Sequence, residues 1–364
     1  MASYHLSVKT VKRSAGQSAT ASAAYRSGES IACEREGRVH DYTAKQGIAE
    51  TFILAPDDTP SWVQDRAALW NAAEARETRR NSVTAREWEL ALPSEVSDQD
   101  RSQIARDFAQ TLVDRYGVVA DVAIHAPHRE GDQRNHHAHI LTTTRVMSEV
   151  GLTDKTRVLD AAKTGGVEIE QMRGVWAEMQ NAALERAGRA QGLDAGEISQ
   201  VDHRSLEAQR IAALSRGDEM SAEELDRAPE LKLGPAANAM ERREIRMAAV
   251  EGRDYEPVTE RGRAVHAARQ ARELFAEVRE RLELARETYG LARDEGQGRV
   301  SAGLAALRTA AGKDRAQQDS EQIRERLENV LGRERAAHNE EPGKDLEKER
   351  DTARGRGLDD GLEL

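Results

Sequence analysis

The stretch "DVAIHAPHREGDQRNHHAHILTTTR", residues 121–145, concentrates half of the chain's ten histidines in a pattern that predicts a β-hairpin. Its two ends, "ADVAIHAP" (120–127) and "HHAHILTTTR" (136–145), are strand-like runs, and "HREGDQRN" connects them. The dipeptide formed by Gly131 and Asp132 is typical of a turn between antiparallel strands. We therefore expect the two runs to pair with each other.

The position of this turn determines which histidines meet. If the hairpin is centred on the glycine of the turn, His125 lies directly opposite His137, because both are six residues from that centre. Directly opposed residues have Cβ atoms about 4.5–5.5 Å apart, and a diagonal neighbour such as His139 lies at about 7–8 Å. These three imidazoles should converge on one face. His136 should point to the opposite face, and His128 should fall in the loop.

Three converging histidines can hold one metal ion. A set of three imidazoles leaves coordination positions open, as a catalytic metal site requires. Imidazole suits zinc, nickel, copper or iron, whereas Mg²⁺ prefers oxygen ligands, so the ligands alone leave the ion open. The alternative interpretation is that His137 and His139 are polar residues on a solvated face of the sheet.

The rest of the chain up to about residue 170 shows both strand and helix patterns. Period-2 alternation predicts strands, and apolar residues at helical spacing next to capping signals predict helices. The expected strands are 4–10 and 85–93, and the expected helices are 20–28, 61–80 and 97–117. We predict an α+β fold in which helices pack on a central antiparallel sheet.

Beyond about residue 170 the sequence is mostly helical. It becomes highly charged from residue 258, where a coiled coil or a helical hairpin is compatible with a single apolar stripe at helical spacing. The stripe consists of Leu274, Val278, Leu282, Ala285 and Tyr289. We expect three regions: a catalytic domain over 1–250, a charged amphipathic helical region over 251–338, and a disordered tail over 339–364 that has almost nothing to bury.

Composition argues against membrane and secreted classes. The sequence holds no apolar run of about 18 residues, and "MASYHLSVKT" leads into basic residues without a signal-peptide core. The single cysteine, Cys33, permits no internal disulfide and suits a reducing compartment. We expect a cytoplasmic protein without membrane insertion.

The distribution of charge points to a polyanionic partner more clearly than its sum does. The net charge of −11 would argue against nucleic-acid binding, yet residues 1–28 contain no acidic residue. This segment could therefore contact phosphate groups. The candidate basic residues are Lys9, Lys12, Arg13 and Arg26, together with Arg145 at the end of the second histidine-bearing strand.

Tyr25 is a candidate nucleophile because it lies in this acid-free segment, next to Arg26. Tyrosine has an unperturbed pKa near 10, so it is a poor nucleophile until a nearby cation favours the phenolate. On its own, a tyrosine on an Ala-rich helix is equally compatible with packing.

Six segments of the sequence occur in a characteristic order. They are "YHLSVKTVKRSAGQSATASAAYRSGE", "HDYTAKQGI", "AREWELALP", "DVAIHAPHREGDQRNHHAHILTTTR", "VDHRSL" and "KLGPAANAMERRE". Together they resemble the MobA/MobL family of plasmid relaxases, of the MobQ class, within the wider histidine-hydrophobic-histidine endonucleases. The resemblance covers roughly residues 1–250. It departs from many relatives at His136, where they have proline.

The resemblance implies specific roles for residues of this chain. It implies a central antiparallel sheet with packed helices and a metal site whose ligands fall on His125, His137 and His139. The nucleophile of the family falls on Tyr25. The glutamate of the "AREW" strand falls on Glu87, and it would lie near the metal and orient a histidine or the tyrosine.

The implied reaction is the cleavage of one DNA strand at a plasmid transfer origin. The oxygen of Tyr25 would form a 5′-phosphotyrosyl link and free a 3′-hydroxyl, so that the strand can later be rejoined. A divalent ion, Mg²⁺ or Mn²⁺, would offset the charge of the transition state. The implied partner is single-stranded origin DNA. Apart from the resemblance, the apolar stripe of the C-terminal helices suggests docking to another helix, in a second copy or in a protein of the transfer machinery.

Two other functions remain compatible with the residues. A metal-dependent hydrolase of a small substrate would use the histidines without Tyr25, and a non-enzymatic plasmid DNA-binding protein would need no metal. Within the relaxase interpretation, Tyr42 of "HDYTAK" is the second candidate nucleophile.

Overall fold

The computed structural model describes residues 4–128, 132–161, 163–195 and 198–312. The chain forms two compact units, of which the first ends at Ser205 and the second begins at Leu206. The predicted catalytic domain over 1–250 follows the extent of the sequence resemblance, and its boundary stays a prediction. The predicted disordered tail over 339–364 lies outside the described residues.

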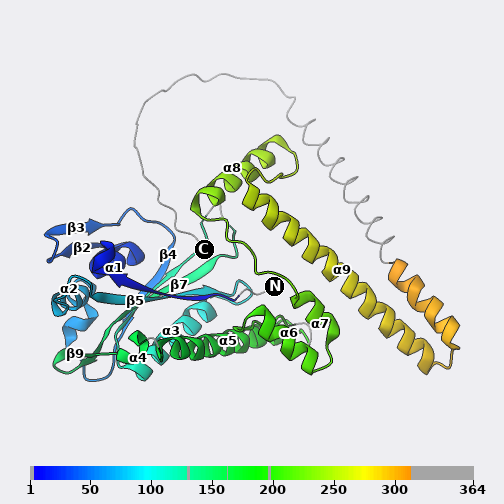
Figure 1. Cartoon of the computed structure of the whole chain (residues 1–364), viewed down its shortest axis with the longest axis horizontal. Helices are drawn as coiled ribbons and strands as arrows, with labels where there is room; N and C mark the ends of the chain where they lie inside the picture. The colour runs from blue at the N-terminus through cyan, green and yellow to red at the C-terminus, as the bar shows by residue number, and fades with distance from the viewer. Residues whose placement is uncertain (1–3, 129–131, 162, 196–197, 313–364) are drawn as a thin grey trace, which may run out of the picture. The chain divides into compact units, whose positions relative to one another are not determined.

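The first unit is built on a five-stranded sheet with the strand order β1-β5-β7-β6-β4, in which every neighbouring pair is antiparallel (Figure 1). Two small hairpins, β2-β3 and β8-β9, accompany it. The predicted α+β fold with a central antiparallel sheet is confirmed. The strands are β1 (Leu6–Lys12), β2 (Ser30–Cys33), β3 (Arg38–Asp41), β4 (Ile48–Leu54), β5 (Val83–Leu92), β6 (Ala120–His125), β7 (His136–Thr143), β8 (Arg145–Ser148) and β9 (Gly151–Lys155).

The register between β6 and β7 is the one predicted from the sequence. His125 pairs directly with His137, and Ala123 pairs with His139. The glycine of the predicted turn lies outside the described residues. β7 is the central strand of the sheet, so the histidines that it carries lie between β5 and β6.

The described residues of the first unit form five α-helices, and helices cover both faces of the sheet (Figure 1). They are α1 (Ala19–Ser27), α2 (Arg66–Arg76), α3 (Asp98–Tyr116), α4 (Arg157–Asp160) and α5 (Gly165–Ala190). The larger core lies between the sheet and helices α3 and α5. Ser97 caps α3, and Gly117 ends it in a left-handed conformation, close to the boundaries expected from sequence.

Three large aromatic residues connect the layers of this core. Trp88 of β5, Phe108 of α3 and Trp176 of α5 are fully buried. The ring of Phe108 meets that of Trp88 at 6.2 Å and that of Trp176 at 5.4 Å, both edge to face. Aromatic side chains bury the largest apolar areas, so this cluster is a main source of stability for the sheet and its two helices.

The opposite face of the sheet is covered by α1 and α2. Helix α1 presents small side chains, including the buried Ala23 and Ala24, which allow the helix backbone to come close to the sheet. Gly28 ends the helix at a φ of 68°, a conformation that suits glycine. The C-terminal end of α1 is therefore set firmly against the sheet face that carries the three histidines.

Helix α2 begins later than its sequence pattern suggested. We expected a helix from residue 61, but Ser61–Gln64 forms a 3-10 turn, and the side chain of Asp65 caps α2 by accepting from the backbone NH of Ala68. An aspartate cap satisfies an unpaired NH at a helix start, so it determines the boundary more strongly than the preceding Pro-Ser pair. The helix ends at Arg76, short of the expected residue 80.

The sequence analysis did not identify β4 or the two small hairpins. β4 is an edge strand whose side chains are nearly all half-buried, so it lacks the alternation that marks a half-buried strand. The hairpin strands contain only four or five residues, which is too few to show a period.

The second unit is helical in its described part. It contains α6 (Leu206–Ser215), α7 (Glu219–Leu225), α8 (Pro235–Glu251) and α9 (Glu260–Asp294), followed by a further helical run over 299–312. The residues of the predicted apolar stripe lie on α9. Leu274, Val278 and Leu282 of its apolar stripe are exposed. None of the helices in the described part of the chain has the length and apolar character that crossing a membrane requires.

We predict that Trp88→Ala lowers the free energy of unfolding by about 3–5 kcal/mol, because it removes the fully buried side chain that joins β5 to α3. Urea unfolding followed by circular dichroism measures the change. The matched control is Val39→Ala on the exposed side of β3, for which we expect a change within about 0.5 kcal/mol. Equal losses in the two variants would show that this aromatic cluster does not stabilise the unit.

Candidate metal centre

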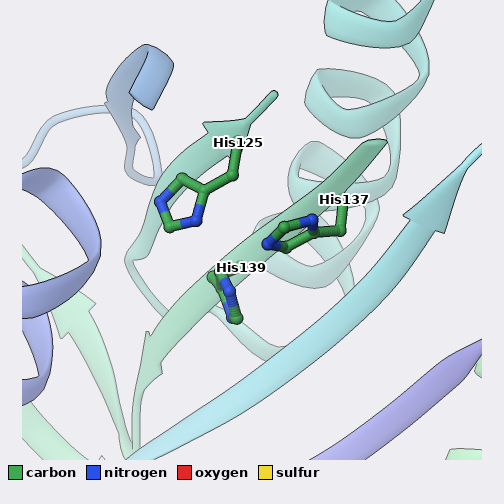
Figure 2. A group of neighbouring side chains, drawn as sticks. All are labelled: His125, His137 and His139. Carbon is green, nitrogen blue, oxygen red and sulfur yellow. The ribbon is translucent and has the colours of Figure 1, made fainter. Parts of the chain in front are cut away.

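Three histidine side chains converge on the sheet face that is covered by α1. The ring centroids of His125, His137 and His139 lie 5.0–5.2 Å from one another, and each residue offers a ligand atom within 4.8 Å of the other two. Figure 2 shows the rings of the two neighbouring strands turned toward one another. The convergence predicted from the hairpin register is therefore present.

The other two histidines of the stretch are not part of this group. His136 points to the opposite face of the sheet, where it lies near Arg101 and Asp98 of α3. His128 is exposed in the connecting loop. The alternation of side chains along β7 thus separates ligand candidates from their neighbours, as expected.

Each imidazole of the group uses one nitrogen as a donor to an oxygen atom that can only accept. The bonds run from His125 Nε2 to the carbonyl of Arg26 (2.8 Å), from His137 Nδ1 to the carbonyl of Asn135 (3.1 Å), and from His139 Nδ1 to Oε1 of Glu87 (2.8 Å). In a neutral imidazole the second nitrogen then carries a lone pair. Such outer contacts fix the tautomer and orientation of metal-binding histidines in general.

Burial keeps two of these rings neutral. Desolvation lowers the pKa of His125 to about 3 and that of His137 to about 4, and the neighbouring His139 contributes in the same direction. Both rings are therefore unprotonated at neutral pH. Because neutral imidazole is the form that binds metal ions, a divalent cation could enter without displacing a proton from either ring.

Glu87 connects the histidine group to α1. Its carboxylate lies in the middle of β5, where Oε1 accepts from Nδ1 of His139 and from Nε of Arg26. Although burial opposes ionisation, the hydrogen bonds from His139 and Arg26 hold the pKa of Glu87 well below its usual range. The residue is a buried carboxylate bonded to a histidine, rather than an exposed strand residue.

The C-terminal end of α1 brings Tyr25 to the edge of this group. The next residue, Arg26, contacts His125 through its carbonyl and Glu87 through its guanidinium. The half-buried ring of Tyr25 meets Tyr42 edge to face, with ring centroids 5.2 Å apart. The first and second candidate nucleophiles therefore lie side by side.

The candidate DNA-contacting residues fall into two groups. Lys12 is exposed, and the half-exposed Lys9 forms an ion pair with Glu89. Arg13 and Arg145 instead form ion pairs and hydrogen bonds within the first unit. Arg13 pairs with Glu74 and donates to two backbone carbonyls, and Arg145 donates to Glu77 and to the carbonyl of Thr153. Since these two guanidinium groups are largely buried and already paired, they are poor candidates for binding phosphate.

Sequence reasoning missed two residues near the histidines. Glu89 lies two positions after Glu87 and therefore on the same strand face, a signal that the "AREWELALP" pattern did contain. It accepts from Ser7 and Lys9, and attraction to Lys9 and His139 helps to lower its pKa against the effect of burial. Lys45 belongs to the loop before β4, and no periodicity marks it.

A second group of ligand-type residues is an ion-pair cluster. Cys33, Glu36 and His40 of the β2-β3 hairpin also bring ligand atoms within 4.8 Å of one another. However, the carboxylate oxygens of Glu36 are bound by Arg35 at 2.6 Å and by Arg38 at 2.7 Å. Because these two cations already neutralise Glu36, the group is better suited to stabilising the hairpin than to holding a metal.

Curated proteins with similar sequences are named as mobilization proteins and conjugal transfer proteins. Mobilization protein MobL of Acidithiobacillus ferridurans is 38% identical over 269 residues, which cover 67% of this chain and 65% of that protein. Probable mobilization protein MobA of Bifidobacterium longum is 31% identical over 57% of this chain and 41% of its own length. Conjugal transfer protein TraA of Rhizobium radiobacter is 36% identical over 43% of this chain, but over only 14% of its own length. The chain thus spans less than two thirds of these relatives.

One solved structure, from work on vancomycin resistance transfer in Staphylococcus aureus, aligns with a TM-score of 0.46 and 28% identity over 56% of this chain and 98% of that one. The family model described as MobA/MobL matches residues 17–243, well over half of the chain. The matched range includes Tyr25, Glu87 and the three converging histidines. The chain therefore belongs to the MobA/MobL family.

Proposed function

We propose that the protein is a relaxase that nicks one DNA strand at a plasmid transfer origin and later rejoins it. The observation that carries this proposal is the contact between His125 and the carbonyl of Arg26, because it places the tyrosine-bearing end of α1 beside the histidine group. Family membership and the names of the relatives support the same function.

In the proposed reaction, the phenol oxygen of Tyr25 attacks the scissile phosphorus and loses its proton. A Tyr–O–P bond forms as the P–O3′ bond breaks, and the departing 3′-oxygen takes up a proton. The link to Tyr25 conserves the energy of the phosphodiester, so the reverse attack by a 3′-hydroxyl can rejoin the strand. This reversibility is what a protein that transfers and recloses a strand requires.

The histidine group suits a divalent cation, since its three imidazoles each offer a ligand atom and would leave coordination positions open. A bound ion would offset the negative charge that builds on the phosphate oxygens. The chain's own contribution is orientation. Glu87 accepts from Nδ1 of His139 and from the guanidinium of Arg26 on α1. The same carboxylate would therefore orient a metal ligand and the helix that carries the nucleophile.

We propose that fewer basic residues bind the DNA backbone than the sequence predicted. Lys9 and Lys12 remain candidates, because both side chains are largely exposed. Arg26 is a weaker candidate, since its largely buried guanidinium is paired with Glu87 and donates to the carbonyl of Ser22. The exposed stripe of α9 is proposed to dock to another helix, in a second copy or in a protein of the transfer machinery.

We predict that His125→Ala, His137→Ala and His139→Ala each weaken Mn²⁺ binding by at least roughly 10–100-fold. Loss of a residue that only orients a metal ligand already has an effect of that size, so loss of a ligand should have at least the same. His136→Ala and His128→Ala are the matched controls, since the first residue faces α3 and the second lies in the loop. Calorimetric titration of the five variants measures the affinities. Similar losses in all five would mean that these three imidazoles do not form the site.

We predict that Tyr25→Phe abolishes the covalent protein–DNA adduct and leaves single-stranded DNA binding intact, because only the attacking oxygen is removed. The adduct is measured on a denaturing gel with an oligonucleotide from the DNA that flanks the gene. Tyr42→Phe, which alters the ring 5.2 Å away, is the matched control and should still form adduct.

An adduct that persists in Tyr25→Phe and disappears only in Tyr42→Phe would reassign the nucleophile. If the unaltered protein binds the oligonucleotide and never forms an adduct, it is a DNA-binding protein rather than a relaxase. A metal-dependent hydrolase of a small substrate would show neither adduct nor strand cleavage.

We predict that a variant ending at Gly252 folds and cleaves the same oligonucleotide at the rate of the full chain. The histidines, Tyr25 and Glu87 all lie in the first compact unit, so the reaction should not need the helices beyond Gly252. Cleavage by both proteins is compared under identical salt and metal. A folded truncation without cleavage would show that the later helices belong to the nuclease.

A further inference from the structure

Lys45 makes two contacts with the same residue, Tyr25. Its ammonium donates to the carbonyl oxygen of Tyr25 at 2.9 Å, and it lies 3.7 Å from the centroid of the Tyr25 ring. The first contact holds the backbone at the end of α1, and the second is a cation–π contact with the side chain. One group thus restrains both the position and the ring of the proposed nucleophile.

The loop that carries Lys45 is held at both ends. The backbone NH of Lys45 donates at 2.9 Å to the carbonyl of Tyr42, the residue directly after β3. On the other side, the carbonyl of Gly47 accepts from the NH of Ala126, immediately after β6. Gly47 has a φ of 85°, which lets the chain turn into β4 without strain. The ammonium is therefore positioned by the fold and not only by its own flexible side chain.

The electrostatic surroundings of Lys45 make its charge effective at Tyr25. Burial lowers the pKa of Lys45 to about 8, repulsion from Arg26 adds to the decrease, and attraction to Glu87 opposes it. A half-buried charge is screened less than one in water, and 3.7 Å is well inside the screening length of about 10 Å at 0.1 M salt. The guanidinium of Arg26, by contrast, is bound to Glu87.

We propose that Lys45 is a positioning residue that fixes the ring of Tyr25 for attack. The positive charge of Lys45 also stabilises the negative charge on the phenol oxygen of Tyr25. The inference rests on the proposed relaxase function. The phenol oxygen carries this charge when it attacks the phosphorus and again when it leaves during rejoining. Lys45 therefore acts in both directions of the reaction, separately from the histidine group.

The test uses the full chain with Mn²⁺ and a single-stranded origin oligonucleotide. Lys45→Met removes the charge and the donor, Lys45→Gln keeps a donor without the charge, and Lys45→Arg keeps both. Single-turnover rates of adduct formation and of rejoining are measured beside the oligonucleotide Kd from fluorescence anisotropy. Lys163→Met, an exposed lysine between α4 and α5, is the matched control.

We expect Lys45→Met and Lys45→Gln to slow both reactions by roughly 10–100-fold with little change in Kd, as loss of a partly desolvated cation–π contact implies. Lys45→Arg should restore most of the rate, and Lys163→Met should match the unaltered protein. If Lys45→Met is unstable, Lys45→Gln and Lys45→Arg still separate charge from packing.

Several results would overturn the inference. Unchanged rates in Lys45→Met or Lys45→Gln would show that the charge is not used, and an Lys45→Arg variant as slow as Lys45→Met would do the same. A large rise in Kd at an unchanged rate would make Lys45 a DNA contact instead. If the unaltered protein forms no adduct, the proposed function itself fails, which is a distinct outcome.

Discussion

The pairing of His125 with His137 across β6 and β7 is the constraint on which the site depends. A shift of one residue in an antiparallel pair turns every side chain of a strand to the other face. With that shift, His136 would take the place of the ligand candidates, and His137 and His139 would face α3. The alternating apolar residues of β7 prevent this shift, because Ala138 and Ile140 must stay buried in the larger core.

The two faces of the sheet therefore differ in composition and in role. The face against α3 and α5 holds the aromatic cluster and most of the apolar burial, so it stabilises the register. The face against α1 can then carry polar and ionisable groups such as Glu87 and His125 without losing its alignment. Buried carboxylates and neutral histidines are costly unless paired, and each of these has a hydrogen-bond partner.

Glu87 links the histidine group to the helix that carries Tyr25, and Lys45 contacts the same helix. Glu87 bonds to His139 and Arg26, and Lys45 bonds to the carbonyl of Tyr25 from a different loop. The end of α1 is thus held from the sheet on one side and from the loop before β4 on the other. Tyr25, the proposed nucleophile, lies on a short helix of nine residues, whose end is held by these contacts as well as by the helix itself.

The sequence by itself determined the local features. Alternation and the position of the turn predicted the face shared by His125, His137 and His139, because the period of a strand and the centre of a hairpin are local properties. Capping residues likewise marked α1 and α3, whereas the short hairpins and the edge strand β4 left no periodic signal. Only the tertiary structure decided which basic residues remain available, since Arg13 and Arg145 are paired with Glu74 and Glu77 from distant segments. It also placed Lys45 on Tyr25, because a contact between a loop and a helix twenty residues apart depends on how both pack against the sheet.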